Sequence, residues 1–153
     1  MTIHFREAQI TDLDILMRYM QEFHKFDHVE AFDEIPARRA MLKVISDKTI
    51  GRVWLIQQAQ DTVGYIVLTL AYRLEYRGYY AFLDELYIRE DKRGQGIGTQ
   101  ALAFLKDSCP ALGATLLQLE VKQNNPQAAA LYNKVGFTSQ ARTVLTKAIN
   151  KQQ

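Results

Sequence analysis

The stretch Arg93-Gly94-Gln95-Gly96-Ile97-Gly98 separates an aromatic, β-branched segment from one whose apolar residues recur at helical spacing. It is therefore predicted to turn the chain from a strand into a helix. Glycines in such a turn let the backbone come close to a ligand, and the N–H groups of the first helical turn can point at one anion. With the positive charge of Arg93, these features predict a site for a phosphate or pyrophosphate group.

Regular strand and helix patterns precede this turn. Alternation over residues 3–8 predicts a half-buried strand, and two helices should follow it. The first helix is preceded by a capping box, Thr11-Asp12-Leu13-Asp14, and the second is predicted to begin at Pro36. Segments rich in β-branched and aromatic residues then predict three consecutive antiparallel strands, over residues 53–56, 63–70 and 80–88.

Further elements are predicted after the turn. Pro110 should end the helix that the turn begins, and a strand follows over residues 115–121. A short helix should run from Pro126 to Gly136, and a closing hairpin from Phe137 onward. The order β-αα-βββ-α-β-α-ββ is typical of an α/β (α+β) fold, with one mixed, mostly antiparallel sheet flanked by about four helices. We expect a single domain over residues 1–150.

Composition and charge narrow the classes of protein to which the chain can belong. Its 153 residues are 48% hydrophobic and 24% charged, as in ordinary globular domains, and the net charge is +2. This balance provides no broad basic surface, so we expect no nucleic-acid partner. We expect no membrane partner either, because no apolar run could span a bilayer and the N-terminus has no apolar signal segment. The lone Cys109 cannot form an internal disulfide, which suits a cytoplasmic protein.

The glycine-rich turn has three competing interpretations. Glycines can serve turn geometry alone, but three alternating glycines beside an arginine exceed what a tight turn needs. Gly96-x-Gly98-x-x-Ala101 satisfies the dinucleotide-binding fingerprint, with Glu120 near the expected ribose-binding acid. That fingerprint belongs to the first βαβ unit of its fold, whereas about two thirds of this chain precedes it. A P-loop is excluded because no Gly-Lys-Ser/Thr follows the turn.

The third interpretation depends on three blocks in the second half of the chain. The blocks are Leu83-Asp84-Glu85-Leu86-Tyr87-Ile88, then Arg93-x-x-Gly96-x-Gly98, and finally Leu119-Glu120-Val121 through Asn124-Asn125, Ala129 and Leu131-Tyr132 to Val135-Gly136-Phe137. In the order and spacing of these blocks the chain resembles the GNAT family of acetyl-CoA-dependent N-acetyltransferases. The predicted order of elements along the whole chain is also similar to the GNAT fold.

The resemblance implies acetyl-CoA as the cosubstrate and no metal ion. In GNAT proteins the pyrophosphate lies mainly on backbone N–H groups of the glycine-rich turn, here Arg93, Gly94, Gln95, Gly96, Ile97, Gly98 and Thr99. The pantetheine arm adds alongside the preceding strand, here Leu86, Tyr87 and Ile88. The thioester then lies where this strand and residues 115–121 diverge. Asn125 matches a position near the pantetheine, and Lys134 one near the adenosine-phosphate end.

The chemistry of this family is the attack of an amine on a thioester, and an alkylammonium must first lose a proton to a base. Asp84 and Glu85 are the candidate bases. In a regular strand they face opposite sides, so only one should point at the acetyl group unless a bulge redirects the other. The resemblance favours Asp84 as the base and Glu85 as a ligand of the amine. The alternative is that one or both are solvated strand carboxylates.

Tyr132 matches the family position that donates a proton to the departing thiolate, and a phenol is a suitable acid for this step. The alternative is a place in the core, since Tyr132 shares a helical stripe with Leu131 and Val135. His24 and His28 have a spacing that zinc ligands use, but no third ligand accompanies them, so no metal site is expected.

These observations predict an N-acetyltransferase that moves an acetyl group from acetyl-CoA to a primary amine by direct attack in a ternary complex. The alternative is a non-catalytic acetyl-CoA-binding sensor or interaction module, against which the intact acid and tyrosine positions argue. The resemblance also implies that the segment between the first two helices forms one wall of the acceptor site. This segment carries Glu22, Asp27, Glu30, Asp33 and Glu34 against Lys25, so the acceptor, a small-molecule or peptide amine, is expected to be cationic. A homodimer is common in the family, but no sequence feature specifies an interface.

Overall fold

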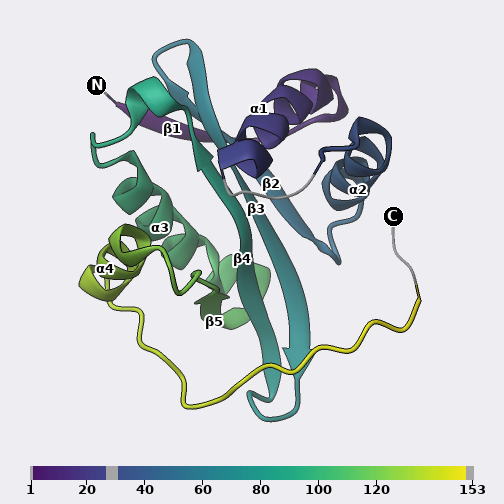
Figure 1. Cartoon of the computed structure of the whole chain (residues 1–153), viewed down its shortest axis with the longest axis vertical. Coiled ribbons are helices and arrows are strands. Elements are labelled where there is room, and N and C mark those ends of the chain that lie inside the picture. The colour runs from purple at the N-terminus through teal and green to yellow at the C-terminus, as the bar shows by residue number, and fades with distance from the viewer. Residues whose placement is uncertain (1, 27–30, 151–153) are drawn as a thin grey trace. The chain divides into compact units, whose positions relative to one another are not determined.

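In the part of the chain that the structure describes, residues 2–26 and 31–150 of a computed structural model, five strands form one sheet (Figure 1). The strands lie in the order of the sequence: β1 (Ile3–Glu7), β2 (Gly51–Gln58), β3 (Asp61–Arg73), β4 (Gly78–Ile88) and β5 (Ala114–Leu119). The first four pair antiparallel with their neighbours, and β5 pairs parallel with β4. The predicted mixed, mostly antiparallel sheet is therefore confirmed.

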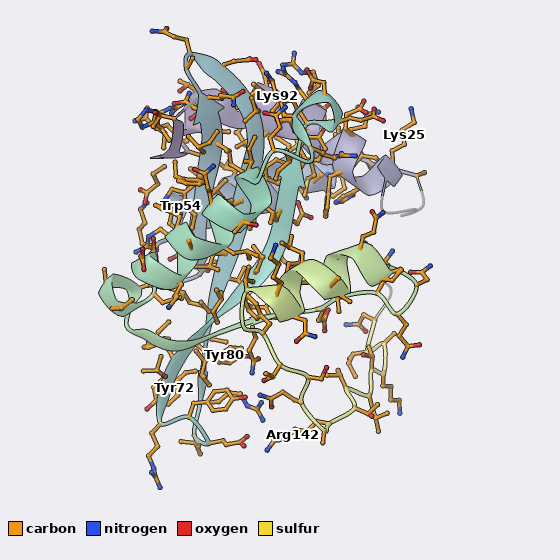
Figure 2. The ribbon with its side chains drawn as sticks, turned by 90° about the vertical axis from the view of Figure 1, so that its left-hand side faces the viewer. Lys25, Trp54, Tyr72, Tyr80, Lys92 and Arg142 are labelled. Atoms are coloured by element: carbon orange, nitrogen blue, oxygen red, sulfur yellow. The ribbon has the colours of Figure 1, made fainter. Side chains whose placement is uncertain are left out.

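Helices cover both faces of this sheet (Figure 1). One face carries α1 (Leu13–Phe26) and α2 (Glu34–Ser46), and the other carries α3 (Ile97–Ser108). Alternation along β2 explains this arrangement, because successive side chains point to opposite faces. Val53 and Leu55 belong to the core beneath α1 and α2, whereas Trp54 meets Phe104 of α3 edge to face, with ring centroids 5.2 Å apart (Figure 2).

Hydrogen bonds to backbone groups decide where the first two helices begin. The Asp33 side chain accepts a hydrogen bond from the backbone N–H of Ile35 at 3.2 Å, so α2 begins two residues before the predicted Pro36. Before α1, Asp12 accepts a hydrogen bond from the backbone N–H of Gln9 at 2.7 Å, which puts the cap one short turn earlier than the predicted box at Thr11.

None of the helices in the described ranges combines the length and the apolar character that a membrane crossing requires.

The chain divides into two compact units, Met1–Glu120 and Val121–Gln153. The first contains the sheet and α1 to α3, and the second contains α4 (Pro126–Lys134), which begins at the predicted Pro126. The closing hairpin predicted from Phe137 onward is not formed, because the described residues up to 150 contain no strand there. The apolar side chains of this segment stay exposed, so their burial does not offset the entropy cost of ordering two strands; they are Val144, Leu145 and Ile149.

The close pairing of β3 and β4 depends on Gly64. A Cβ atom at this position would lie 2.1 Å from the backbone oxygen of Tyr87. We expect Gly64→Ala to lower the free energy of unfolding by about 1–3 kcal/mol, since one strand must move away from the other. Gly78→Ala is the matched control, because its nearest contact is the Tyr76 backbone oxygen at 3.9 Å. Equal denaturation midpoints for the two variants would contradict this account.

Candidate active site

The glycine-rich turn has a backbone shape that allows close approach to an anion. Gly94 and Gly96 have φ angles of 77° and 81°, in the left-handed region that favours glycine. A Cβ atom added to either would meet nothing within 4 Å, so there is open space in front of the turn. Gly96 is the N-cap of α3 and supplies no side chain to cap it, and the first turn of the helix has no acidic residue. The N–H groups there, of Ile97, Gly98 and Thr99, can therefore point at one bound anion.

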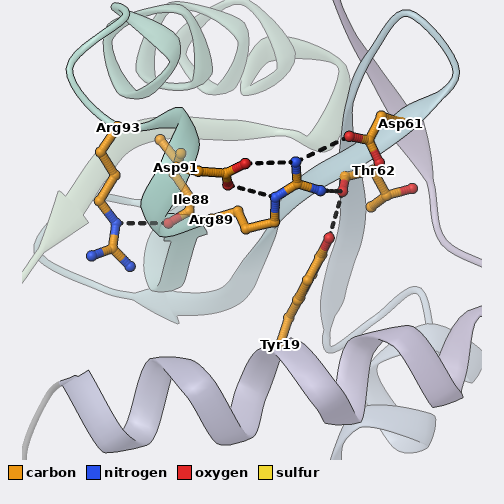
Figure 3. Close-up of polar contacts among 7 residues, drawn as sticks. All are labelled: Tyr19, Asp61, Thr62, Ile88, Arg89, Asp91 and Arg93. Carbon is orange, nitrogen blue, oxygen red and sulfur yellow. Dashed lines mark hydrogen bonds and ion pairs between the residues drawn. The ribbon is translucent and has the colours of Figure 1, made fainter.

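Arg93 lies between the end of β4 and this turn. Its Nε donates a hydrogen bond to the backbone oxygen of Ile88 at 2.8 Å (Figure 3). Its guanidinium carbon also lies 5.7 Å from the centre of the Tyr87 ring, within the range of a cation–π contact. These contacts hold a positive charge beside the last residues of β4.

Arg89 fastens the end of β4 to β3, although no motif in the sequence predicts this role (Figure 3). Its guanidinium donates to both carboxylate oxygens of Asp91, at 2.7 and 3.0 Å, and forms an ion pair with Asp61 at 3.1 Å. A further N–H group donates to the backbone oxygen of Thr62, which also accepts the hydroxyl of Tyr19 from α1. The turn therefore starts from a fixed position on the sheet.

The two ladders of β4 differ in length. β3 pairs with β4 along its whole length, up to Gly64 opposite Ile88. β5 pairs with β4 only as far as Leu119 opposite Leu83. In the described sheet, the backbone of Leu86 to Ile88 thus has a strand partner on one side only. An extended chain that carries amide groups can add to such an edge.

A β-bulge interrupts β4 at Asp84. Val67 lies opposite Glu85, whereas the next residue of β3, Leu68, lies opposite Leu83, so Asp84 is the extra residue. Residues that lie opposite each other share a face of the sheet, and Val67 belongs to the core on the α1 face. Glu85 therefore faces α1. The bulge that was needed to change the aim of one of the two carboxylates is present.

Asp84 lies where β4 and β5 begin to diverge. It follows Leu83, and Glu120 follows Leu119, so two acids come directly after the last residue pair of the two strands. The Asp84 side chain reaches the surface, but the protein around it removes part of its hydration. This burial, together with the negative charge of Glu120, raises the pKa of Asp84. A raised pKa makes a carboxylate a stronger proton acceptor.

Glu85 has two side-chain partners, from two other elements of the first unit. The Tyr65 hydroxyl donates a hydrogen bond to its Oε1 at 2.7 Å, and Nε2 of His24 lies 3.2 Å from its Oε2. Burial raises the pKa of Glu85, and the hydrogen bonds from Tyr65 and His24 partly oppose this change. Sequence reasoning missed both partners. His24 is 61 residues from Glu85 in the chain, so no local spacing connects them.

The second unit contains the remaining predicted residues. Asn125 caps α4, where its Oδ1 accepts a hydrogen bond from the backbone N–H of Ala128 at 3.1 Å. Tyr132 is half-buried, its ring meets Phe137 edge to face at 6.0 Å, and burial raises the pKa of its phenol. Lys134 is exposed in the last turn of the helix. The approach of these side chains to Asp84 or to the glycine-rich turn stays a prediction.

The acidic segment predicted to form one wall of the acceptor site is only partly described. Asp27 and Glu30 lie outside the described residues, as does His28. Asp33 caps α2, and Glu34 pairs with Arg38 at 3.0 Å, so both of these acids have structural partners. Within residues 2–26 and 31–150, no group of three or more His, Cys, Asp or Glu side chains could hold a metal ion.

Comparison with known proteins gives a consistent result. The family model described as "Acetyltransferase (GNAT) family" matches residues 13–137. An aminoalkylphosphonate N-acetyltransferase of Salmonella typhimurium is 29% identical over 89 residues, 58% of this chain and 57% of that protein. An L-methionine sulfoximine/L-methionine sulfone acetyltransferase of Pseudomonas paraeruginosa is 25% identical over 142 residues, 90% of this chain and 81% of that protein.

Other relatives match over different shares of their length. The match to an uncharacterized N-acetyltransferase of Bacillus subtilis, 36% identical over 59 residues, covers 39% of this chain and 24% of that protein. The chain thus spans less than two thirds of the length of two of these relatives, the Bacillus and Salmonella proteins. Among solved structures, an integron cassette protein from the mobile metagenome of Cole Harbour Salt Marsh is 34% identical, with a TM-score of 0.85 over 97% of this chain and 91% of that one.

Proposed function

The chain belongs to the acetyltransferase (GNAT) family, and on this premise we propose that it transfers an acetyl group from acetyl-CoA to a primary amine by direct attack in a ternary complex. One observation supports this proposal most. The glycine-rich turn, at a helix N-terminus without a side-chain cap, follows β4 after one short 3-10 turn (Glu90–Lys92). In the described sheet, β5 pairs with β4 only as far as Leu83. A pyrophosphate with an extended, amide-bearing arm has the chemistry that fits both features.

We assign the cosubstrate contacts from this fit. The backbone N–H groups of the turn would hold the pyrophosphate, with Arg93 adding positive charge, while Leu86, Tyr87 and Ile88 would offer backbone groups to the pantetheine. Asn125 would contribute its side-chain N–H₂ near the pantetheine, because its oxygen already caps α4. Lys134 would reach the adenosine-phosphate end.

Three side chains would move or hold protons. Acetyl-CoA supplies an electrophilic thioester carbon. Glu85 would hold the acceptor's ammonium group, and Asp84 would take one proton from it, so that the neutral nitrogen can form its bond to the acetyl carbon. Tyr132 would donate its phenol proton to the sulfur as the C–S bond breaks. The attacking nitrogen keeps one proton in the amide and would release its other proton to solvent. The carboxyl group of Asp84 and the phenolate of Tyr132 then return to their starting states by proton exchange with solvent.

A free-thiol release assay with a panel of amines tests the proposed function. The panel includes an aminoalkylphosphonate, methionine sulfoximine, polyamines, aminoglycosides, amino acids and peptides with free N-termini. We expect thiol release that depends on both acetyl-CoA and one class of amine. The alternative, a non-catalytic acetyl-CoA sensor or interaction module, predicts coenzyme binding by calorimetry without thiol release for any amine.

The buried Cys109 also suits a reducing compartment, so we propose a cytoplasmic location.

We propose that the acceptor is cationic, and the dependence on salt tests this. Attraction of an ammonium group by acidic side chains weakens as ions screen it, so kcat/KM should fall as ionic strength rises. The triple variant Asp27→Asn, Glu30→Gln, Asp33→Asn should raise KM more than it lowers kcat. Asparagine at position 33 can still cap α2. Asp107→Asn on α3 is the control. A neutral best acceptor, or an unchanged KM in the triple variant, would contradict a cationic acceptor and leave the acetyltransferase proposal intact.

A further inference from the structure

Glu85 is held by side chains from two elements that are distant in the chain. His24 comes from α1 and Tyr65 from β3, and each contacts a different carboxylate oxygen. The side chains of His24 and Glu85 are 21% and 14% exposed, while Tyr65 is completely buried. Glu85 thus lies at the boundary between the core and the solvent, with its orientation determined from the core side.

The roles of donor and acceptor follow from the chemistry of a carboxylate. An ionised carboxylate can only accept hydrogen bonds, so with Glu85 ionised both the Tyr65 hydroxyl and Nε2 of His24 donate. Two carboxylate oxygens can accept about four hydrogen bonds, and these two partners use one on each oxygen. Capacity therefore remains for the N–H groups of an ammonium ion.

Aromatic rings fix the position of the imidazole. Phe32 meets the His24 ring edge to face at 5.5 Å, and Phe23 lies 5.8 Å from it. Phe23 also meets the ring of Tyr65 edge to face at 6.4 Å. Phe23 therefore contacts the rings of both partners of Glu85. The titratable groups that act on Glu85 among the described residues are His24 from α1, Tyr65 from β3 and Asp84 on its own strand.

We infer that His24 and Tyr65 are positioning residues that hold the Glu85 carboxylate ionised and aimed at the ammonium group of the acceptor. This inference rests on the proposed function, in which Glu85 contacts the acceptor and Asp84 is the base. The preference for a cationic acceptor would then depend on three residues from three elements: His24 of α1, Tyr65 of β3 and Glu85 of β4. Neither His24 nor Tyr65 needs to touch the substrate for this role.

The variants His24→Leu and His24→Gln separate positioning from packing. Leucine removes the N–H donor, whereas glutamine keeps one near the position of Nε2. With His24→Leu, we expect the acidic limb of kcat/KM to move to higher pH by about one unit, because a lost hydrogen bond to a charged group lets burial raise the pKa of Glu85 further. KM for the cationic acceptor should rise about tenfold at the pH of that limb, with a smaller change in kcat. His24→Gln should restore most of the wild-type profile, and Tyr65→Phe should change it in the same direction as His24→Leu.

Two control variants and a second measurement complete the test. His4→Leu on β1 and Tyr72→Phe should leave the pH profile unchanged. Tyr72 lies near the turn of the β3–β4 hairpin, opposite Tyr79 (Figure 2). The pKa of Glu85, followed by carboxyl ¹³C NMR without any substrate, should be higher in His24→Leu and Tyr65→Phe than in the wild type. An unchanged pKa would overturn the inference even in an active enzyme. If His24→Gln changed the pH profile and KM as much as His24→Leu does, the imidazole itself would take part in the chemistry and the positioning role would be wrong. If no amine were acetylated, the proposed function would fail, and the NMR result would decide separately whether His24 and Tyr65 hold Glu85 ionised.

Discussion

A chain with Gly96→Glu is expected to lose most of its affinity for coenzyme A while keeping its fold. An added Cβ atom at this position meets no neighbour within 4 Å, and the carboxylate of the new side chain enters the region where the N–H groups of α3 would hold a pyrophosphate. Two like charges about 4 Å apart repel by roughly 4 kcal/mol at the effective dielectric of a protein surface. That corresponds to an increase in Kd of about a thousandfold, which calorimetry can measure.

Gly113→Glu is the matched control for this experiment. Gly113 has a φ angle of 77° and also has no neighbour within 4 Å of an added Cβ, but it precedes β5 and lies outside the glycine-rich turn. Both variants should therefore lose a similar amount of stability, about 1–2 kcal/mol, for a side chain in left-handed backbone. Only Gly96→Glu should lose affinity. If the two folded variants had equal affinities for coenzyme A, the glycine-rich turn would not be the pyrophosphate site.

The substitution Tyr132→Phe should lower kcat by about a hundredfold and leave the affinity for coenzyme A nearly unchanged. It keeps the ring that packs against Phe137 and removes only the hydroxyl. Burial raises the pKa of this phenol above its usual value near 10, so it is protonated at neutral pH and able to donate to a thiolate. General acid assistance typically contributes a factor of about a hundred or more.

The measurement must report the chemical step. Single-turnover mixing of the acetyl-CoA complex with the best acceptor gives that rate directly, and calorimetry gives the coenzyme affinity of the same variant. Tyr72→Phe is the control, because this tyrosine is 57% exposed on the β3–β4 hairpin. If Tyr132→Phe had the wild-type rate, Tyr132 would serve packing alone and would not donate a proton.

The parts of the site that sequence reasoning could predict are encoded within a few neighbouring residues. The alternating glycines beside Arg93 predict a turn for close backbone approach, and in the structure Gly94 and Gly96 have left-handed φ angles. Pro126 marks the first residue of α4 in the sequence and in the structure. Such signals depend on local backbone geometry, which a short stretch of sequence specifies by itself.

The parts that sequence reasoning missed depend on residues far apart in the chain. Glu85 of β4 meets His24 of α1 across 61 residues, and Arg89, just after β4, pairs with Asp61 at the start of β3. No spacing rule connects such pairs, because the register of the sheet and the packing of α1 bring them together. The predicted hairpin after Phe137 is absent from the described residues for a related reason. Apolar and β-branched residues favour a strand, but a strand also needs a partner edge and buried side chains.

The bulge makes the packing of the sheet independent of Asp84, the carboxylate that we propose as the base. If residue 84 were absent, Leu83 could still lie opposite Leu68 and Glu85 opposite Val67, with every neighbouring side chain on its present face. The core therefore depends on side chains that alternate between the two faces of β4, and Asp84 is not part of this alternation. Asp84 is in effect a one-residue insertion into a strand that is complete without it. A related chain one residue shorter at this point could keep the same fold and stability and still lack this acid. If Asp84 is the base, as we propose, the number of residues between Leu83 and Glu85 would inform about activity where overall similarity does not.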